Sequence, residues 1–248
     1  MSECQQTDKP VAAVIGGSSG IGAAISARLD RDGHRVVVVG SRPESDVREL
    51  LSGLTEGDYV RADLRDQAAA DSVVASALDL HGRLDVVVYS AGATTRIPHP
   101  DIDLVTDEVW DRILTLNLIA PWRIIRAAAP ALRRSQDGAF VVVGALAGAD
   151  VGGSSIPYAV SKAAVHHMCK LLGAALGPEV RVNAVAPGFI ETPWTDGWDA
   201  LRNSVIGKAP LARVGVPDDV ADLVAGLIAS KYVTGQTVVI DGGLSLIP

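Results

Sequence analysis

The sequence is poor in the residues that cross-link secreted domains, bind metals or attract nucleic acids. It has only two cysteines, Cys4 and Cys169, so we expect no disulfide framework or zinc site and a reducing, cytoplasmic setting. His166 and His167 are adjacent and would face different sides of a helix, which argues against a metal pair. The 22 Lys and Arg residues and 29 Asp and Glu residues give a net charge of −7, with no basic tract. We therefore expect no metal, no nucleic-acid partner and no anionic membrane partner.

Long apolar runs are also absent, and short ones recur in their place. No segment reaches the roughly 18 apolar residues of a membrane span, and MSECQQTDKP at the start has no apolar signal region. Short runs rich in Val and Ala alternate with amphipathic stretches, which is typical of a parallel sheet covered by helices on both faces. The sequence therefore predicts one α/β domain over residues 1–248, a Rossmann-type doubly wound sheet of about seven strands.

The expected elements account for most of the chain. Strands are predicted at 11–16, 35–40, 58–62, 85–90, 139–144, 181–186 and 237–241. Helices are predicted near 20–32, 43–53, 66–81, 107–133, 157–176 and 217–230. Residues 188–215 fit no element and mix Trp, Pro and Gly, so we expect a mobile substrate lid there. Trp194 and Trp198 in this segment either close over an apolar or ring-bearing substrate or pack the lid against the body.

A glycine-rich turn, IGGSSGIG, joins the first expected strand to the first expected helix. Gly16 permits the tight turn, Gly20 lets the backbone approach a pyrophosphate, and Gly22 lets the helix pack closely on the sheet. Turns of this composition also occur without a ligand. The strand before this turn and the helix after it favour dinucleotide binding.

The end of the second strand bears on which dinucleotide binds. An NAD site usually has an acidic residue there to hold the ribose hydroxyls, and here no carboxylate appears before Glu44. Ser41 and Arg42 can contact a 2′-phosphate, which favours NADP(H) over NAD(H), although Arg42 also fits a solvated loop. Asp63, followed by Leu64, has a position suited to an adenine contact, and a turn-forming aspartate explains it equally well.

Tyr158 and Lys162 are the strongest candidates for chemistry. Residues four apart share one face of a helix, so the phenol and the ammonium can meet. A nearby cation stabilises phenolate, and we expect it to lower the pKa of Tyr158 and make this residue a general acid and base. With a bound dinucleotide, the pair indicates hydride transfer to or from a small-molecule substrate.

Taken in order, these motifs resemble the short-chain dehydrogenase/reductases of the single-domain type. The glycine turn, Asp63 and the YxxxK pair of Tyr158 and Lys162 all match the family pattern, and so does the C-terminal end. Asn117 resembles the helix asparagine that holds a water beside the catalytic lysine. The resemblance implies cofactor contacts at Gly16, Ser18, Ser19, Gly20, Ile21, Gly22, Ser41, Arg42, Asp63, Leu64, Ser90, Ala91, Gly92, Tyr158, Lys162, Pro187, Gly188, Ile190 and Thr192.

The resemblance also implies a mechanism and an assembly. The hydride passes between nicotinamide and a carbonyl carbon while Tyr158 transfers the proton. Lys162 binds the nicotinamide ribose, and Asn117 connects the lysine to solvent through water. The helices at 107–133 and 157–176 resemble those that pair in the family's homodimers, and the C-terminal strand resembles the second contact of its homotetramers. We expect a homodimer or homotetramer. The unusual active-site residues and the tryptophans of the segment 188–215 favour a role in secondary metabolism.

The chain departs from the family pattern on its substrate side. The catalytic serine normally lies thirteen residues before the tyrosine, where this sequence has Ala145. Loss of one such donor typically costs about 10²–10³ in rate. Either Ser154 or Ser155 replaces that donor, or the reaction needs none, as in imine reduction or a non-redox cyclisation, isomerisation or elimination that uses Tyr158. Both serines also fit a polar turn with Ser155 near a helix N-cap.

Overall fold

The computed structural model describes residues 9–247, so Cys4 lies outside the described residues. Seven strands form one parallel sheet in the order β3-β2-β1-β4-β5-β6-β7, which confirms the predicted doubly wound fold. The strands are β1 (Val11–Ile15), β2 (Arg35–Gly40), β3 (Gly57–Arg61), β4 (Val86–Tyr89), β5 (Gly138–Val143), β6 (Val180–Pro187) and β7 (Thr237–Ile240). The strand order reverses between β1 and β4, and such a reversal leaves a crevice at the carboxyl ends of the strands.

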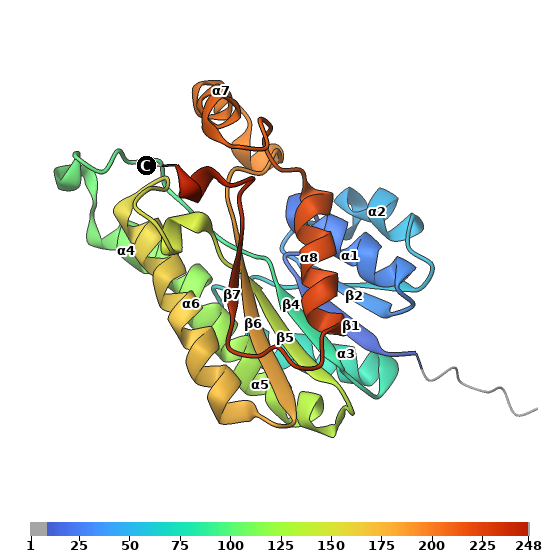
Figure 1. Cartoon of the computed structure of the whole chain (residues 1–248). Helices are drawn as coiled ribbons and strands as arrows, with labels where there is room; N and C mark the ends of the chain where they lie inside the picture. Colours follow the sequence, from blue (N-terminus) through green and yellow to red (C-terminus); the bar gives the residue numbers. More distant parts are fainter. Residues whose placement is uncertain (1–8, 248) are drawn as a thin grey trace, which may run out of the picture.

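Helices cover both faces of this sheet (Figure 1). On one face α1 and α8 pack against each other, and on the other α3 packs on α5 while α6 packs on β6. The α-helices are α1 (Gly20–Arg31), α2 (Arg48–Ser52), α3 (Ala69–His81), α4 (Asp107–Leu114), α5 (Ala120–Arg134), α6 (Ile156–Leu176), α7 (Asp199–Lys208) and α8 (Pro217–Ala229).

Alternate residues of each strand enter two separate cores. In β1, Ala13 and Ile15 are fully or almost fully buried with residues of α3 and α5, whereas Ala12 and Val14 are fully buried with residues of α1 and α8. Side chains on both faces of the strand are therefore removed from water. This double burial explains why the strands read as unbroken apolar runs rather than as an alternating pattern.

Three predicted helices differ from the observed ones. The stretch predicted at 107–133 is α4 and α5 joined by a π-helical turn at Thr115–Ile119. The stretch predicted at 43–53 contains only a 3-10 turn and the five residues of α2. The helix predicted at 66–81 begins three residues later, because the Asp66 carboxylate accepts a hydrogen bond from the Ala68 amide in a turn that precedes it.

The segment 188–215 contains secondary structure, so the expectation that it fits no element is wrong. It holds a 3-10 turn at Pro193–Thr195 and the ten-residue helix α7, which stands above the carboxyl ends of the strands (Figure 1). A single parallel bridge between Ile190 and Gly215 closes its base. Gly197 and Pro210 confine the helical stretch to about three turns, too short for a clear amphipathic pattern. That this segment moves stays a prediction.

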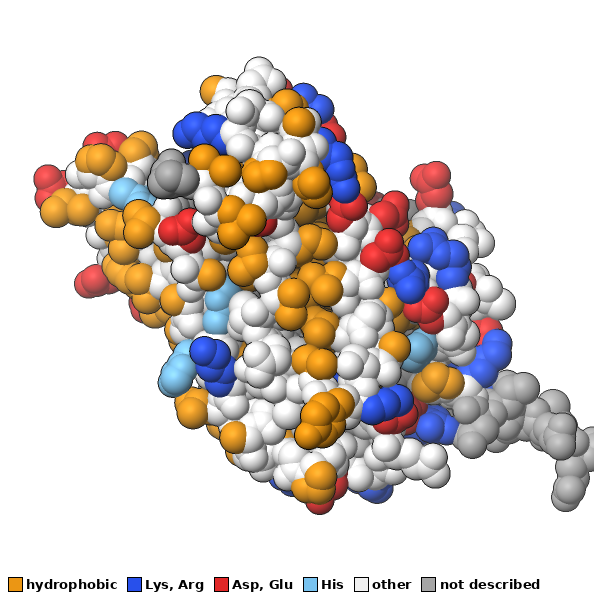
Figure 2. Space-filling model, in the orientation of Figure 1, with side chains coloured by type: hydrophobic (Ala, Val, Ile, Leu, Met, Phe, Trp, Pro, Cys, Tyr) orange, Lys and Arg blue, Asp and Glu red, His pale blue; other side chains and the backbone are white. Residues whose placement is uncertain are grey.

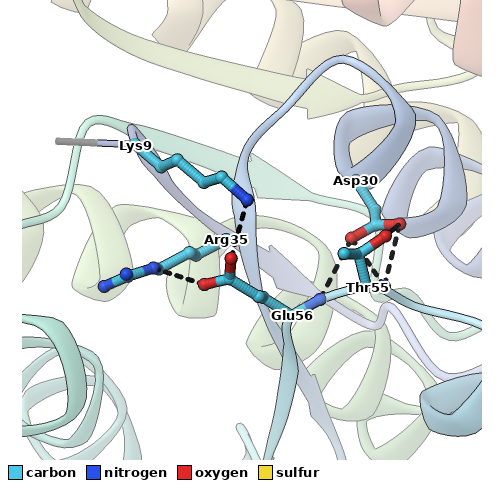
Figure 3. Close-up of polar contacts among 5 residues, drawn as sticks. All are labelled: Lys9, Asp30, Arg35, Thr55 and Glu56. Carbon is cyan, nitrogen blue, oxygen red and sulfur yellow. Dashed lines mark hydrogen bonds and ion pairs between the residues drawn. The ribbon is translucent and has the colours of Figure 1, made fainter. Parts of the chain in front are cut away.

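A cluster of polar contacts ties β1, β2 and β3 together at their amino ends (Figure 3). Lys9 and Arg35 donate to the two carboxylate oxygens of Glu56, each at 2.6 Å. Beside them, the Asp30 carboxylate accepts hydrogen bonds from the amide and the hydroxyl of Thr55. Such partly exposed contacts each contribute at most about 1 kcal/mol. These contacts fix the amino ends of the three strands and lie away from their carboxyl ends.

The surface over β7 is rich in apolar side chains, which Figure 2 shows between α6 and α8. β7 is an edge strand, and its Val239 is 40% exposed; Leu246 and Ile247 follow it and are exposed as well. No helix within residues 9–247 has the length and apolar character needed to cross a membrane. The cytoplasmic setting stays a prediction.

Candidate active site

A cavity of about 660 Å³ lies at the carboxyl ends of the strands. It extends from the glycine turn after β1 to the segment that follows β6. Every residue that the sequence analysis placed at the cofactor lines this cavity. Residues from distant parts of the chain meet here because parallel strands present all their carboxyl ends at one edge of the sheet.

The glycine turn approaches its neighbours so closely that side chains are excluded. Gly16 has a φ of +79°, and a Cβ there would lie 2.6 Å from the amide nitrogen of Ala91. A Cβ on Gly22 would overlap the carbonyl oxygen of Gly16. Ser19, the N-cap of α1, makes no side-chain cap bond with any described residue. The first amides of α1 are therefore open to an anion, as a pyrophosphate site requires.

Basic side chains from the segments after β2 and β3 lie at the end of the cavity next to the glycine turn, here called the adenosine side. Ser41 and Arg42 are exposed and line the cavity, and Arg65 pairs with Asp63 at 2.5 Å. Hydrogen bonds from Arg65 hold the pKa of the Asp63 carboxyl below its usual range. Arg61 donates to the Ser41 carbonyl oxygen at 3.2 Å. Among residues 9–247, Asp63 is the only carboxylate that lines the cavity, so this end carries a net positive charge.

Tyr158 and Lys162 lie on successive turns of α6 and both line the cavity. The Lys162 Nζ atom is 5.7 Å from the centroid of the Tyr158 ring and donates a 3.0 Å hydrogen bond to the Val143 carbonyl oxygen at the end of β5. The lysine is 5% exposed. The helix thus brings phenol and ammonium to one place, as their spacing predicts.

The protonation of this pair differs from the sequence prediction. Desolvation raises the pKa of the Tyr158 phenol to about 12, and desolvation lowers the pKa of Lys162 to about 8. The expected lowering of the Tyr158 pKa is therefore wrong for the described chain. The spacing of the two residues indicates their proximity, but it carries no information about how strongly their surroundings exclude water. Desolvation, which disfavours the charged phenolate, is the cause of the raised Tyr158 pKa.

Asn117 is buried in the π-helical turn and does not line the cavity. Its Oδ1 atom accepts a hydrogen bond from the Ala93 amide at 2.7 Å, and its Nδ2 atom donates to the Ser161 hydroxyl at 2.9 Å. A Cβ on Gly92 would lie 3.4 Å from the Asn117 Oδ1 atom and 3.8 Å from the Lys162 Nζ atom. The asparagine therefore joins the loop after β4 to α6 and lies close to the lysine.

Ala145, which is 8% exposed, lines the same cavity as Tyr158 and presents a methyl group in place of a hydroxyl. Ser155 does not line the cavity, because it is fully buried and its hydroxyl caps α6 by accepting from the Tyr158 amide. Ser154 is also absent from the lining, and its hydroxyl is paired with that of Thr94. Neither serine is placed as a substrate donor. The N-cap explanation of Ser155 is the one that the structure shows.

The two tryptophans of the segment 188–215 have different surroundings. Trp194 lines the cavity, whereas Trp198 does not. The Trp198 ring instead lies 6.4 Å from the Phe189 ring and 4.7 Å from the Arg96 guanidinium in the loop after β4. Of the two alternatives in the sequence analysis, Trp198 follows the packing one. Trp194 lines the cavity, and its contact with a substrate stays a prediction.

Comparisons with known proteins identify the family of this chain. A family model described as Enoyl-(Acyl carrier protein) reductase matches residues 15–245. The "Granaticin polyketide synthase putative ketoacyl reductase 2" of Streptomyces violaceoruber is 46% identical over 97% of this chain and 98% of its own. The 3-oxoacyl-[acyl-carrier-protein] reductase FabG of Thermotoga maritima is 34% identical over 94% of this chain and 97% of its own. The chain belongs to the short-chain dehydrogenase/reductase family.

A solved structure of this family gives the same fold. An actinorhodin polyketide ketoreductase variant crystallised with NADPH superimposes with a TM-score of 0.86 at 30% identity, over 96% of this chain and 97% of that one. The protein is therefore an NAD(P)-dependent oxidoreductase of the short-chain dehydrogenase/reductase family. Its glycine turn, open helix end and basic adenosine side fit a dinucleotide on their own geometry.

Two basic residues of the cavity were missed by the sequence analysis. Arg65 lies two residues after Asp63 in the sequence, but only the pairing of β2 with β3 brings the segment after β3 to the same cavity as Arg42. Arg112 on α4 lines the substrate side and donates to the Thr95 hydroxyl in the loop after β4. No local pattern distinguishes Arg112 from a solvated helix residue, so its place depends on the tertiary fold.

Proposed function

We propose that this chain is an NADP(H)-dependent reductase that transfers a hydride to a carbonyl, or an imine, of a small ring-bearing metabolite. The supporting observation is that Tyr158, Lys162 and the glycine turn line one continuous cavity. A relative named for the granaticin polyketide synthase, and a solved relative named as a polyketide ketoreductase, favour a polyketide ketone in secondary metabolism as the substrate.

The preference for NADP(H) follows from the charge on the adenosine side. Ser41, Arg42 and Arg65 line the cavity, and Asp63, the only carboxylate there within residues 9–247, is neutralised by its ion pair with Arg65. A guanidinium binds a phosphate through charge-assisted hydrogen bonds and offers nothing comparable to a ribose hydroxyl. The solved polyketide ketoreductase that resembles this chain was crystallised with NADPH.

In this proposal the side chains of the cavity donate the proton, orient the cofactor and hold the surrounding loop in place. When bound, the nicotinamide supplies the hydride. A Tyr158 pKa of about 12 keeps the phenol protonated at neutral pH, so this side chain donates the proton to the developing alkoxide. Lys162, held by the Val143 carbonyl, orients the ribose and stabilises the phenolate that forms. Asn117 keeps the loop after β4 against α6 through its bonds to Ala93 and Ser161. In this proposal it also connects the lysine to solvent through a water.

We further propose that Ala145 stands where the family has its catalytic serine. A hydroxyl there would donate to the substrate oxygen, and the Ala145 methyl cannot. Tyr158 alone then polarises the carbonyl, which favours substrates that are already activated, such as a ketone conjugated to a ring or an iminium. The segment 188–215 covers this side of the cavity, with Trp194 against the substrate.

Assembly into a homodimer or homotetramer is part of the same proposal. Ile119 and Trp122, on the π turn and α5, are 39% and 44% exposed, and Val160 on α6 is 46% exposed. The edge strand β7 adds a second apolar surface. Covering such faces removes apolar area from water at about 25 cal/mol per Å². Sedimentation of the purified chain distinguishes a monomer, dimer and tetramer.

The decisive experiment follows deuterium from stereospecifically labelled NADPH into the product of a cyclic ketone panel. The proposal requires one deuterium in the product for each NADPH oxidised. Turnover without net cofactor oxidation that Tyr158→Phe abolishes would establish the non-redox alternative of a cyclase, isomerase or lyase.

In the same assay, Ala145→Ser should raise ketone reduction by up to about 10²-fold, the usual effect of one added hydrogen-bond donor. A slower variant would mean that the alanine fits the native substrate.

A further inference from the structure

One buried side chain of α6 has no part in the mechanism above. His166 lies one helical turn beyond Lys162 and is 7% exposed. Its Nε2 atom is buried and has no hydrogen-bond partner within residues 9–247. Its neighbour His167 is exposed. Buried polar atoms are normally paired, so an unpaired one in the catalytic helix requires a physical explanation.

The imidazole fills the space that a side chain at position 144 would occupy. A Cβ on Gly144 would overlap the His166 Nε2 atom and would lie 2.7 Å from its Cδ2 atom. The ring also forms a hydrogen bond to the backbone of Gly148. Gly148 packs on α6 so closely that a Cβ there would lie 2.6 Å from the Ala163 amide nitrogen. The ring is thus held between two glycines.

These two glycines flank the cavity wall that carries Ala145. Val143 and Gly144 line the cavity beside it. Lys162 fixes the end of β5 by donating to the Val143 carbonyl oxygen at 3.0 Å. One turn further along α6, His166 contacts the next residue of the same strand end. Successive turns of the helix therefore hold successive residues of this wall.

We propose that His166 is a positioning residue, whose ring sets the distance between the wall at Ala145 and the Tyr158 hydroxyl. The inference rests on the proposed function. The imidazole acts through Gly144 and Gly148 and does not line the cavity. Desolvation and the nearby Lys162 charge lower the pKa of His166 to about 4, so the ring is neutral at pH 7 and adds no charge beside the lysine.

The first test measures kcat, KM for a cyclic ketone and NADPH affinity in single variants. His166→Ala should lower kcat on the order of tenfold with NADPH affinity unchanged, because a misplacement of about 1 Å at a reacting centre costs up to about 10²-fold. His166→Asn keeps a donor near the Gly148 backbone and should recover part of kcat. His167→Ala is the matched control and should behave as the parent. A parallel loss of NADPH affinity, melting temperature and kcat in His166→Ala would overturn the proposal, because it marks a ring with a purely structural role.

The second test uses the overlap between positions 144 and 166. Gly144→Ala should lower kcat, because its methyl group meets the ring. In the double variant Gly144→Ala/His166→Ala the methyl takes the space that the ring leaves, so kcat should exceed that of Gly144→Ala alone. Additive losses would overturn the proposal, because neighbours that share one space do not act independently. If the parent chain turns over no substrate with NADPH, the proposed function is refuted. The melting temperatures of the parent, the two single variants and the double variant still test the contact between positions 144 and 166.

Discussion

The two ends of the cavity are built in different ways. At the proposed pyrophosphate end the backbone forms the cavity, through glycines such as Gly16 and Gly22 and through the open amides of α1. At the proposed substrate end, side chains from α4 and from separate loops form it, among them Arg112, Ala145 and Trp194. A ligand that never changes can be met by fixed backbone geometry. A substrate that differs between relatives is met by residues that can be exchanged without altering the fold.

The largest effect is expected where the two ends meet, at Tyr158. Tyr158→Phe removes the only proton donor assigned to the reaction and should lower kcat by about 10²–10⁴-fold. NADPH affinity should be nearly unchanged, because the glycine turn is untouched. Stopped-flow measurement of NADPH oxidation and fluorescence titration of NADPH test the two halves separately. A variant that retains its rate would refute the assignment of Tyr158.

At the backbone-built end, Gly16→Ala should weaken NADPH binding by about tenfold to a hundredfold, because its Cβ would lie 2.6 Å from the Ala91 amide nitrogen and would displace the turn. That loss is the equivalent of the roughly 1.5–3 kcal/mol that one hydrogen bond to a charged group contributes. Gly33→Ala is the matched control, since Gly33 has a φ of +90° but open space around it. Both variants should melt at lower temperature, and only Gly16→Ala should lose cofactor affinity. Equal cofactor loss in both would show that the close approach is irrelevant.

On the adenosine side the site depends on side chains again, and Arg42 tests the preference for NADP(H). Arg42→Ala should weaken NADPH binding on the order of tenfold, because a hydrogen bond to a charged group contributes about 1.5–3 kcal/mol, and should leave NADH binding unchanged. Arg134→Ala at the exposed end of α5, away from the cavity lining, is the control. Paired titrations with both nucleotides measure the difference. Equal losses for NADPH and NADH would remove the basis for a 2′-phosphate contact.

The smallest effect concerns stability. The Lys162 pKa of about 8 in the folded chain lies below its ordinary 10.5, so the unfolded chain binds this proton more tightly. The buried ammonium therefore destabilises the fold below about pH 8, and the penalty fades as pH rises toward 10.5. Lys162→Met should raise the melting temperature at pH 7 by about 2–4 °C, which corresponds to about 1 kcal/mol. Calorimetry as a function of pH should show the gain disappear near pH 10.5. A gain independent of pH would exclude this cause.

The contrast between the two ends also explains what the sequence could predict. The strands follow from local apolar runs, and the cavity residues named in advance follow from the glycine turn and the order of the motifs, whereas Arg65 was missed. The pKa of Tyr158 could not be predicted, because spacing does not measure burial. The same holds for Ser155, whose hydroxyl caps a helix, and for Arg112, which only the packing of α4 brings to the cavity.

The spacing of Tyr158, Lys162 and His166 along α6 limits how this enzyme can diversify. Each four-residue step advances about 6 Å and keeps the next side chain on nearly the same face. A one-residue insertion between them would rotate everything beyond it by about 100°, turning the imidazole out of its slot or the ammonium away from β5. Length changes should therefore be tolerated in the loop 149–154 before the helix and rejected within it, so new specificities must arise by substitution in the helix and by insertion in the loops.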